Sequence, residues 1–242
     1  FEPIIFCLFL ILILGISHGA LDNIKGKKLF KIFGYKSSVY FYLAYIVISF
    51  LIVASWFCFP NTVLFIFLVV ASYHFGKEDT VFSFKKKFLI SEFLFFLKGS
   101  SVILMPLLLK KAETIEIFRI LNFNVFESSI FTVQFLIMML FLSFLSSLYI
   151  SQKKNANLIG IMVMDFFSLF ILNFFLTPVL AFTLYFCFLH SIRHSIKLIF
   201  ELDKSIKSGL RKFISRAIPL TLVTGVIFLL AIFFLNNFYK LD

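Results

Sequence analysis

The sequence predicts an all-α protein, a polytopic membrane helical bundle of about eight transmembrane helices. Of its 242 residues, 61% are hydrophobic and only 14% are charged, and the mean hydropathy is +1.05. This composition is typical of membrane proteins. The apolar runs are continuous and do not alternate with polar residues as the strands of a membrane barrel do. Helices are therefore the expected spanning elements.

Eight apolar segments have the length of one membrane crossing, about 20 residues. The first run continues into the polar SHGALDN without a small-residue cleavage pattern, so we expect no separable signal peptide. No internal repeat or soluble segment interrupts the runs, which favours one integral membrane domain over residues 1–242. The expected spans are residues 2–18, 38–59, 62–75, 88–109, 129–150, 157–176, 178–199 and 213–237, the third being short.

The basic residues that give the net charge of +11 are concentrated in the predicted loops. The first, third, fifth and seventh loops are rich in lysine and arginine, the second and sixth are short turns, and the fourth balances basic with acidic residues. By the positive-inside rule, the odd-numbered loops are expected in the cytoplasm and both termini outside. The orientation of the chain in the membrane thus accounts for its excess of basic residues, and we expect no nucleic-acid partner.

The chain has four histidines, and all fall toward the cytoplasmic ends of spans that run inward. They are 12 to 16 residues from the starts of the first, third and seventh spans, which corresponds to about 18–24 Å of helix in a core roughly 30 Å thick. A single membrane histidine is more often a packing residue, but four at one depth favour a shared metal site. They are His18, His74, His190 and His194.

Two of these imidazoles belong to one helix. His190 and His194 are four residues apart and can share a face. His18 and His74 would add one nitrogen each from two other helices. A set of imidazoles suits Fe(II), Zn(II) or Cu(II).

Charged residues near the histidines are candidates to support that site. Asp22, Glu78 and Asp79 follow His18 or His74 by four or five residues, so each carboxylate could accept a hydrogen bond from a ligand imidazole. They are equally well interpreted as solvated charges at the ends of helices. Arg193 is expected to point away from a metal, either pairing with Asp22 or Asp79 or reaching the lipid headgroups.

Two further features stand out within the spans. Gly15 and Gly19 form a small-xxx-small pair around His18 that would let another helix approach closely, although both could be incidental. Lys98 and Asp165 lie deep in the fourth and sixth spans, and we predict that they form a buried ion pair.

Three short motifs resemble those of a known family. HGALDN at 18–23, YHFGKED at 73–79 and HSIRH at 190–194 resemble the signatures of the Brp/Blh family of membrane β-carotene oxygenases, in order and spacing over the whole chain. The resemblance implies a single catalytic membrane domain in the inner membrane of a prokaryotic cell. It also implies Fe(II)- and O₂-dependent cleavage of β-carotene at its central 15,15′ double bond to two molecules of all-trans-retinal, with the four histidines as iron ligands.

One position departs from the expected family pattern. Asn23 stands where relatives are expected often to have a second histidine. With four histidines in total, the resemblance favours a mononuclear iron over a cluster that needs five or more. It implies β-carotene, O₂ and membrane lipid as partners, and no obligate protein partner.

A polyene substrate would need a dry, elongated cavity between helices. Helical spacing places Phe67 and Val70 on the face of His74, and Thr183 and Phe186 on the face of His190, so these are candidate substrate-binding walls. Ordinary core packing explains the same four residues at least as well.

Other classes of membrane protein bind metals or retinal. A haem electron carrier would need histidines on facing helices, whereas residues four apart on one face cannot lie on opposite sides of a porphyrin. A metal or proton transporter would have acidic groups through the membrane depth, and here Glu92 and Asp165 are nearly the only ones. A rhodopsin-like retinal binder needs a deep lysine, for which Lys98 is the sole candidate.

Overall fold

The structure is a computed structural model that describes residues 2–15, 22–35, 37, 39–80, 89–152 and 159–238. Within these ranges the regular elements are all helices. The chain divides into two compact units: Leu43–Tyr185 forms the central unit, and residues 1–42 with 186–242 form the terminal unit. Each unit is described by itself, and the expectation of one integral domain stays a prediction.

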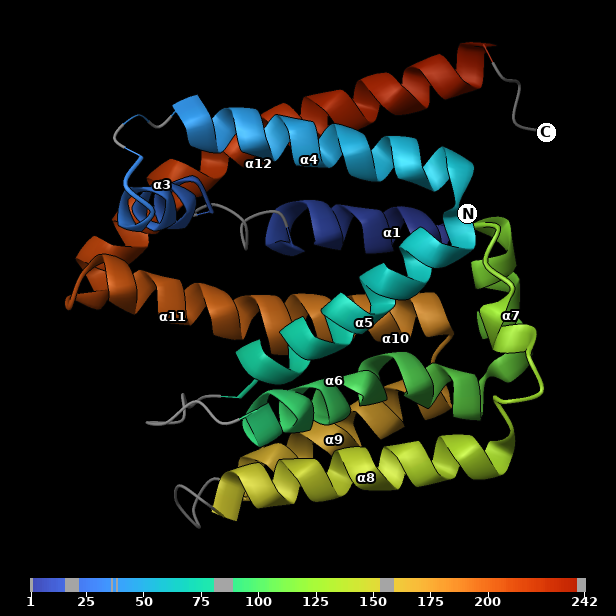
Figure 1. Cartoon of the computed structure of the whole chain (residues 1–242). Helices are drawn as coiled ribbons and strands as arrows, with labels where there is room; N and C mark the ends of the chain where they lie inside the picture. The colour runs from blue at the N-terminus through green and yellow to red at the C-terminus, as the bar shows by residue number, and fades with distance from the viewer. Residues whose placement is uncertain are drawn as a thin grey trace. The chain divides into compact units, whose positions relative to one another are not determined.

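In the central unit, α5, α8 and α9 pack against α6 (Figure 1). α6 contacts α5 most extensively, then α8, α9 and α7, and it is the most buried of the candidate spans. α4 has no buried residue, as expected for a helix surrounded by lipid. Its helices are α4 (Val39–Cys58, shared with the terminal unit), α5 (Pro60–Glu78), α6 (Leu89–Leu109), α7 (Lys111–Ile120), α8 (Val133–Gln152), α9 (Ile159–Phe175) and α10 (Pro178–Leu184).

α5 and α6 pack backbone to backbone. A Cβ added to Gly76 would overlap the carbonyl of Phe95, and one added to Gly99 would overlap the carbonyl of Ser72. Small residues at these positions allow the close approach that membrane helices use in the absence of a hydrophobic driving force. The close packing places the α5 segment that follows His74 directly against α6.

Two loops meet at one end of the central unit. The backbone N–H of Asn124 donates to the Oδ1 of Asn61 (2.9 Å), which joins the loop after α7 to the first turn of α5. The sequence predicts that these two connections lie on the same side of the membrane. Phe126 packs edge to face on both Phe118 and Phe123 beside them.

The terminal unit contains two helices with π-helical geometry. η1 (Ile11–Gly15) continues α1 (Glu2–Leu10), and η4 (Tyr185–Ser191) joins α10 to α11 (Ile192–Leu202). α3 (Asp22–Ile32) and α12 (Ile206–Phe238) complete the unit. α11 packs on α12 through Leu198, Phe213 and Ala217.

A helix lies over each of the eight predicted spans. Five of the described helices are long and apolar enough to cross a membrane, namely Val39–Cys58, Ile90–Leu109, Val133–Gln152, Pro178–Leu202 and Ile206–Leu230. Ile4–Gly15 and Ile159–Phe175 are apolar but shorter, and α5 covers the third span. The protein is thus a helical membrane bundle, and the number of crossings stays at the predicted value of about eight.

Span boundaries differ from the prediction where polar residues cap a helix. α8 begins at Val133 instead of 129, because Thr132 Oγ1 accepts a hydrogen bond from the N–H of Phe135 (3.2 Å). α12 begins at Ile206 instead of 213, after Asp203 and Ser205. α3 and α7 fall in predicted loops, because counting apolar residues does not detect short amphipathic helices.

Candidate metal and substrate site

His190 and His194 are both buried, at 0% and 9% exposure. His190 lies in η4 and His194 in the first turn of α11, so a change from π-helical to α-helical geometry separates them. π-Helical turns are rare and occur often at functional sites. The second described π-helix, η1, ends three residues before His18. Of the two described π-helical segments, η4 therefore contains the predicted metal ligand His190, and η1 ends shortly before the predicted ligand His18.

Phe186 packs on His190 within the terminal unit. Their rings are stacked, with centroids 5.6 Å apart and planes at 19°. A Cβ on Gly15 would come within 2.7 Å of the Phe186 ring, so the absence of a side chain there makes room for that ring. The expected close approach at Gly15 is thus present, while Gly19 lies outside the described residues.

The structure gives less information on the other two predicted ligands, His74 and His18. His74 lies in α5 of the central unit with an exposed side chain, and its ring centroid is 6.0 Å from that of Phe75. His18 lies outside the described residues. Among the residues that the structure describes, no group of three or more His, Cys, Asp or Glu could hold a metal ion. The four-histidine set stays a prediction.

The predicted supporting charges have different surroundings. Asp79 is buried and accepts a hydrogen bond from the hydroxyl of Tyr185. Glu78 and Arg193 are both half-buried. Asp22 is the first residue of α3, and its side chain is outside the described set. Their predicted roles beside the imidazoles stay predictions.

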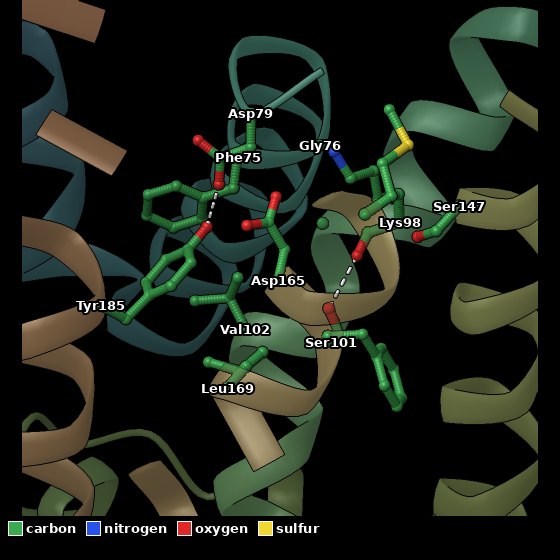
Figure 2. A pocket seen from close by; sticks show the side chains of 13 residues that line it. Phe75, Gly76, Asp79, Lys98, Ser101, Val102, Ser147, Asp165, Leu169 and Tyr185 are labelled. Carbon is green, nitrogen blue, oxygen red and sulfur yellow. Dashed lines mark hydrogen bonds between the residues drawn. The ribbon is translucent and has the colours of Figure 1, made fainter. Parts of the chain in front are cut away.

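A small polar cavity of about 30 Å³ lies inside the central unit. Figure 2 shows the Tyr185 hydroxyl directed at Asp79 and the Asp165 carboxylate turned toward the same space. Its volume is close to that of one water molecule, and its walls offer several polar partners. The wall residues are Phe75, Gly76, Asp79, Lys98, Gly99, Ser101, Val102, Ser147, Met162, Asp165, Phe166, Leu169 and Tyr185.

Lys98 and Asp165 both line this polar cavity, from α6 and α9. Lys98 is 7% exposed, and its Nζ donates to the Oγ1 of Thr80 (3.1 Å). Thr80 Oγ1 in turn donates to the carbonyl of Gly76 (2.6 Å). The two groups predicted to pair are therefore on contacting helices at one cavity, and the ion pair itself stays a prediction.

Sequence reasoning did not find Tyr185. This residue is 5% exposed and bonds to Asp79 across 106 positions of the chain. A tyrosine within an apolar span is a signal that could have identified it, since a buried phenol hydroxyl needs a partner. The hydrogen bond joins the end of the helix that carries His74 to the first residue of η4, which carries His190.

A larger apolar cavity of about 260 Å³ lies between α5, α6, α7, α9 and α10. Of the four predicted substrate walls, Phe67 lines this cavity. Val70 is 57% exposed and does not line it, and Thr183 is fully buried with its hydroxyl bonded to the Val179 carbonyl. Phe186 packs on His190 instead. The structure thus brings Phe67 to this cavity, and the substrate-binding roles of all four residues stay predictions.

The chain was compared with known families, curated proteins and solved structures. The sequence model of beta-carotene 15,15′-dioxygenase matches residues 9–242, a range that includes all four histidines. No curated protein and no solved structure matches the chain. The family match agrees with the resemblance seen in the three motifs, and the chain belongs to the beta-carotene 15,15′-dioxygenase family of carotenoid-cleaving oxidoreductases.

Proposed function

We propose that the protein cleaves β-carotene at its central 15,15′ double bond with O₂, giving two molecules of all-trans-retinal, and that Fe(II) is bound by His18, His74, His190 and His194. The observation that carries this proposal is the family match, which extends over all four histidines. The burial of His190 in the π-helical η4 and of His194 in the first turn of α11 supports it.

The donor chemistry fits an iron ion. Imidazole nitrogen suits divalent iron, and His190 and His194 are both buried, away from competing water. The stacked ring of Phe186 restricts rotation of His190. Asp22, Glu78 and Asp79 would orient imidazoles by accepting their second N–H, and Arg193 would neutralise one of these carboxylates.

The chain's own task in this reaction is to hold and orient the substrate. Bound Fe(II) supplies the one-electron chemistry that makes O₂ reactive toward a double bond. The two oxygen atoms and the two halves of the polyene account for both aldehydes, so the reaction needs no acid, base or external reductant. Apolar walls keep water out and place the central double bond at the histidines.

The membrane supplies both reactants. β-Carotene and O₂ are apolar and dissolve in lipid, so an integral enzyme can take them from the bilayer. We propose a location in the inner membrane of a prokaryotic cell, with both termini outside and the basic loops in the cytoplasm. No obligate protein partner is needed for this reaction.

Expression in cells that make β-carotene tests the proposal. We expect loss of the orange colour with formation of retinal, and iron in the purified protein. His→Ala variants at the four positions should abolish retinal formation and lower bound iron. Ser195→Ala, beside His194 on α11, is the matched control and should behave like the unaltered protein. Full cleavage by any histidine variant would remove that residue from the proposed site.

A further inference from the structure

The apolar cavity of the central unit has walls of hydrocarbon. Aromatic and aliphatic side chains from five helices form it, among them Phe67, Ala71, Phe75, Ile103, Phe118 and Phe182. Cavities of this kind stay dry and bind apolar molecules. The cavity holds about 260 Å³, a little below the range of sites for drug-sized ligands.

The two polar side chains of the cavity are engaged within their own helices. Thr114 Oγ1 donates to the Lys110 carbonyl (2.8 Å), and Asn173 Nδ2 donates to the Leu169 carbonyl (2.9 Å). Both are almost fully buried. Because each of these side chains is hydrogen-bonded to its own helix and the rest of the wall is hydrocarbon, the cavity favours a hydrocarbon over a polar ligand.

One end of the cavity lies next to a predicted iron ligand. Phe75 follows His74 in the chain, and the two ring centroids are 6.0 Å apart. Phe75, Val102 and Leu169 line both the apolar cavity and the small polar cavity. From Phe75 the apolar cavity extends along α5 to Phe67, two helical turns or about 12 Å.

We propose that this cavity receives one ring-bearing end of the carotenoid, and that its depth determines which double bond lies at His74. This inference rests on the proposed function. A cavity of this volume suits one end of the substrate and not the whole molecule. Because β-carotene is symmetric, a pocket that fits one half brings the central bond to His74.

A second apolar cavity provides the control. It holds about 280 Å³ between α6, α8 and α9, and three of its wall residues, Ile137, Phe141 and Phe167, are more than half exposed. Its walls and those of the small polar cavity have one residue in common, Phe166. Such an open surface hollow is suited to lipid chains.

Filling each cavity with the same side chain tests the proposal. Ile103→Trp fills the proposed cavity, and Leu108→Trp, on the same helix, fills the other. We expect Ile103→Trp to lower retinal formation from β-carotene about tenfold, because the indole takes up space that the substrate needs, with bound iron unchanged. Leu108→Trp should have little effect. Ala71→Phe provides a second filling variant in α5.

A shortened substrate separates a blocked cavity from a damaged fold. β-Apo-8′-carotenal lacks the ring at one end, so that end should still enter a partly filled cavity. The loss caused by Ile103→Trp should therefore be several-fold smaller with this aldehyde than with β-carotene. Equal losses on both substrates, or equal losses in the two tryptophan variants, would overturn the cavity proposal. Absence of retinal from the unaltered protein would instead refute the proposed function.

Discussion

At the scale of single residues, the hydrogen bond between Tyr185 and Asp79 connects two helices that carry predicted ligands. Both side chains are more than nine-tenths buried. A buried carboxylate that loses a donor keeps its desolvation cost, which is about 1–3 kcal/mol. This contact therefore stabilises the end of α5 against the start of η4.

Tyr185→Phe removes that donor with little change in shape. We expect the purified protein to melt several degrees lower and to retain less iron, because the helices that carry His74 and His190 lose a fixed connection. Tyr40→Phe, at a site 53% exposed, is the control and should change neither quantity. An unchanged melting temperature would show that the hydrogen bond has no structural role.

The hydrogen bond between Tyr185 and Asp79 could not be predicted from the sequence. His190 and His194 could be selected from spacing and depth alone, since both are local properties of one helix. Tyr185 and Asp79 are 106 positions apart, and no pattern within one span indicates which polar group a buried hydroxyl reaches. Polar residues from several spans, such as Lys98 and Asp165, could be expected to meet only because lipid leaves them few alternatives.

At the scale of elements, the contact between α5 and α6 depends on two glycines. Gly99→Ala places a methyl group against the backbone carbonyl of Ser72, which cannot rotate away as a side chain could. We expect a loss of stability of about 3 kcal/mol, measured by thermal or denaturant unfolding in detergent.

Gly160→Ala is the matched control for this substitution. Gly160 lies in α9, and a Cβ there meets no atom within 4 Å. Alanine also has the higher helix propensity, by about 1 kcal/mol, so this variant should be neutral or slightly more stable. Similar destabilisation of both variants would contradict the packing described for α5 and α6.

Asp203 stabilises the connection between α11 and α12 through hydrogen bonds. Its carboxylate accepts hydrogen bonds from Lys212 Nζ (2.6 Å), the Ser205 N–H (2.9 Å) and the Ser208 hydroxyl (2.8 Å). The hydrogen bond from Lys212, with those from Ser205 and Ser208, holds the pKa of Asp203 well below its ordinary value. Its stabilising effect is present above that ordinary value and is lost as the pH falls through the lowered one.

Asp203→Asn tests this corner through its pH dependence. At pH 7 the variant should melt below the unaltered protein, because the charge that pairs with Lys212 is gone. The difference should begin to shrink below about pH 4, the ordinary pKa of an aspartate. A difference that does not depend on pH would assign the effect to shape alone.

At the scale of the whole molecule, the helical membrane bundle was predictable, because apolarity over about 20 residues is sufficient to identify a candidate crossing. The number of crossings stays a prediction. The π-helical turns and the short helices α3 and α7 were not predictable, since they depend on tertiary packing and amphipathic pattern. The cavities also depend on helix packing, which spacing along one helix does not reveal. Phe67 is the predicted wall that lines the apolar cavity of the central unit.

The predicted orientation can be measured by labelling. In a variant without native cysteines, Ser129→Cys, just before α8, should react with a membrane-impermeant maleimide added to spheroplasts, and Lys207→Cys, at the start of α12, should not. The expected result follows from the lysine-rich odd loops. Labelling of Lys207→Cys alone would invert the topology.

The central claim is iron-dependent cleavage at the middle of the polyene. The most direct measurement is the product ratio from purified protein, loaded with Fe(II) and supplied with β-carotene and O₂. The account predicts two retinal molecules for each β-carotene consumed, with no longer apocarotenal and no activity after the iron is removed by a chelator. Longer apocarotenals as main products, or undiminished cleavage without iron, would contradict it.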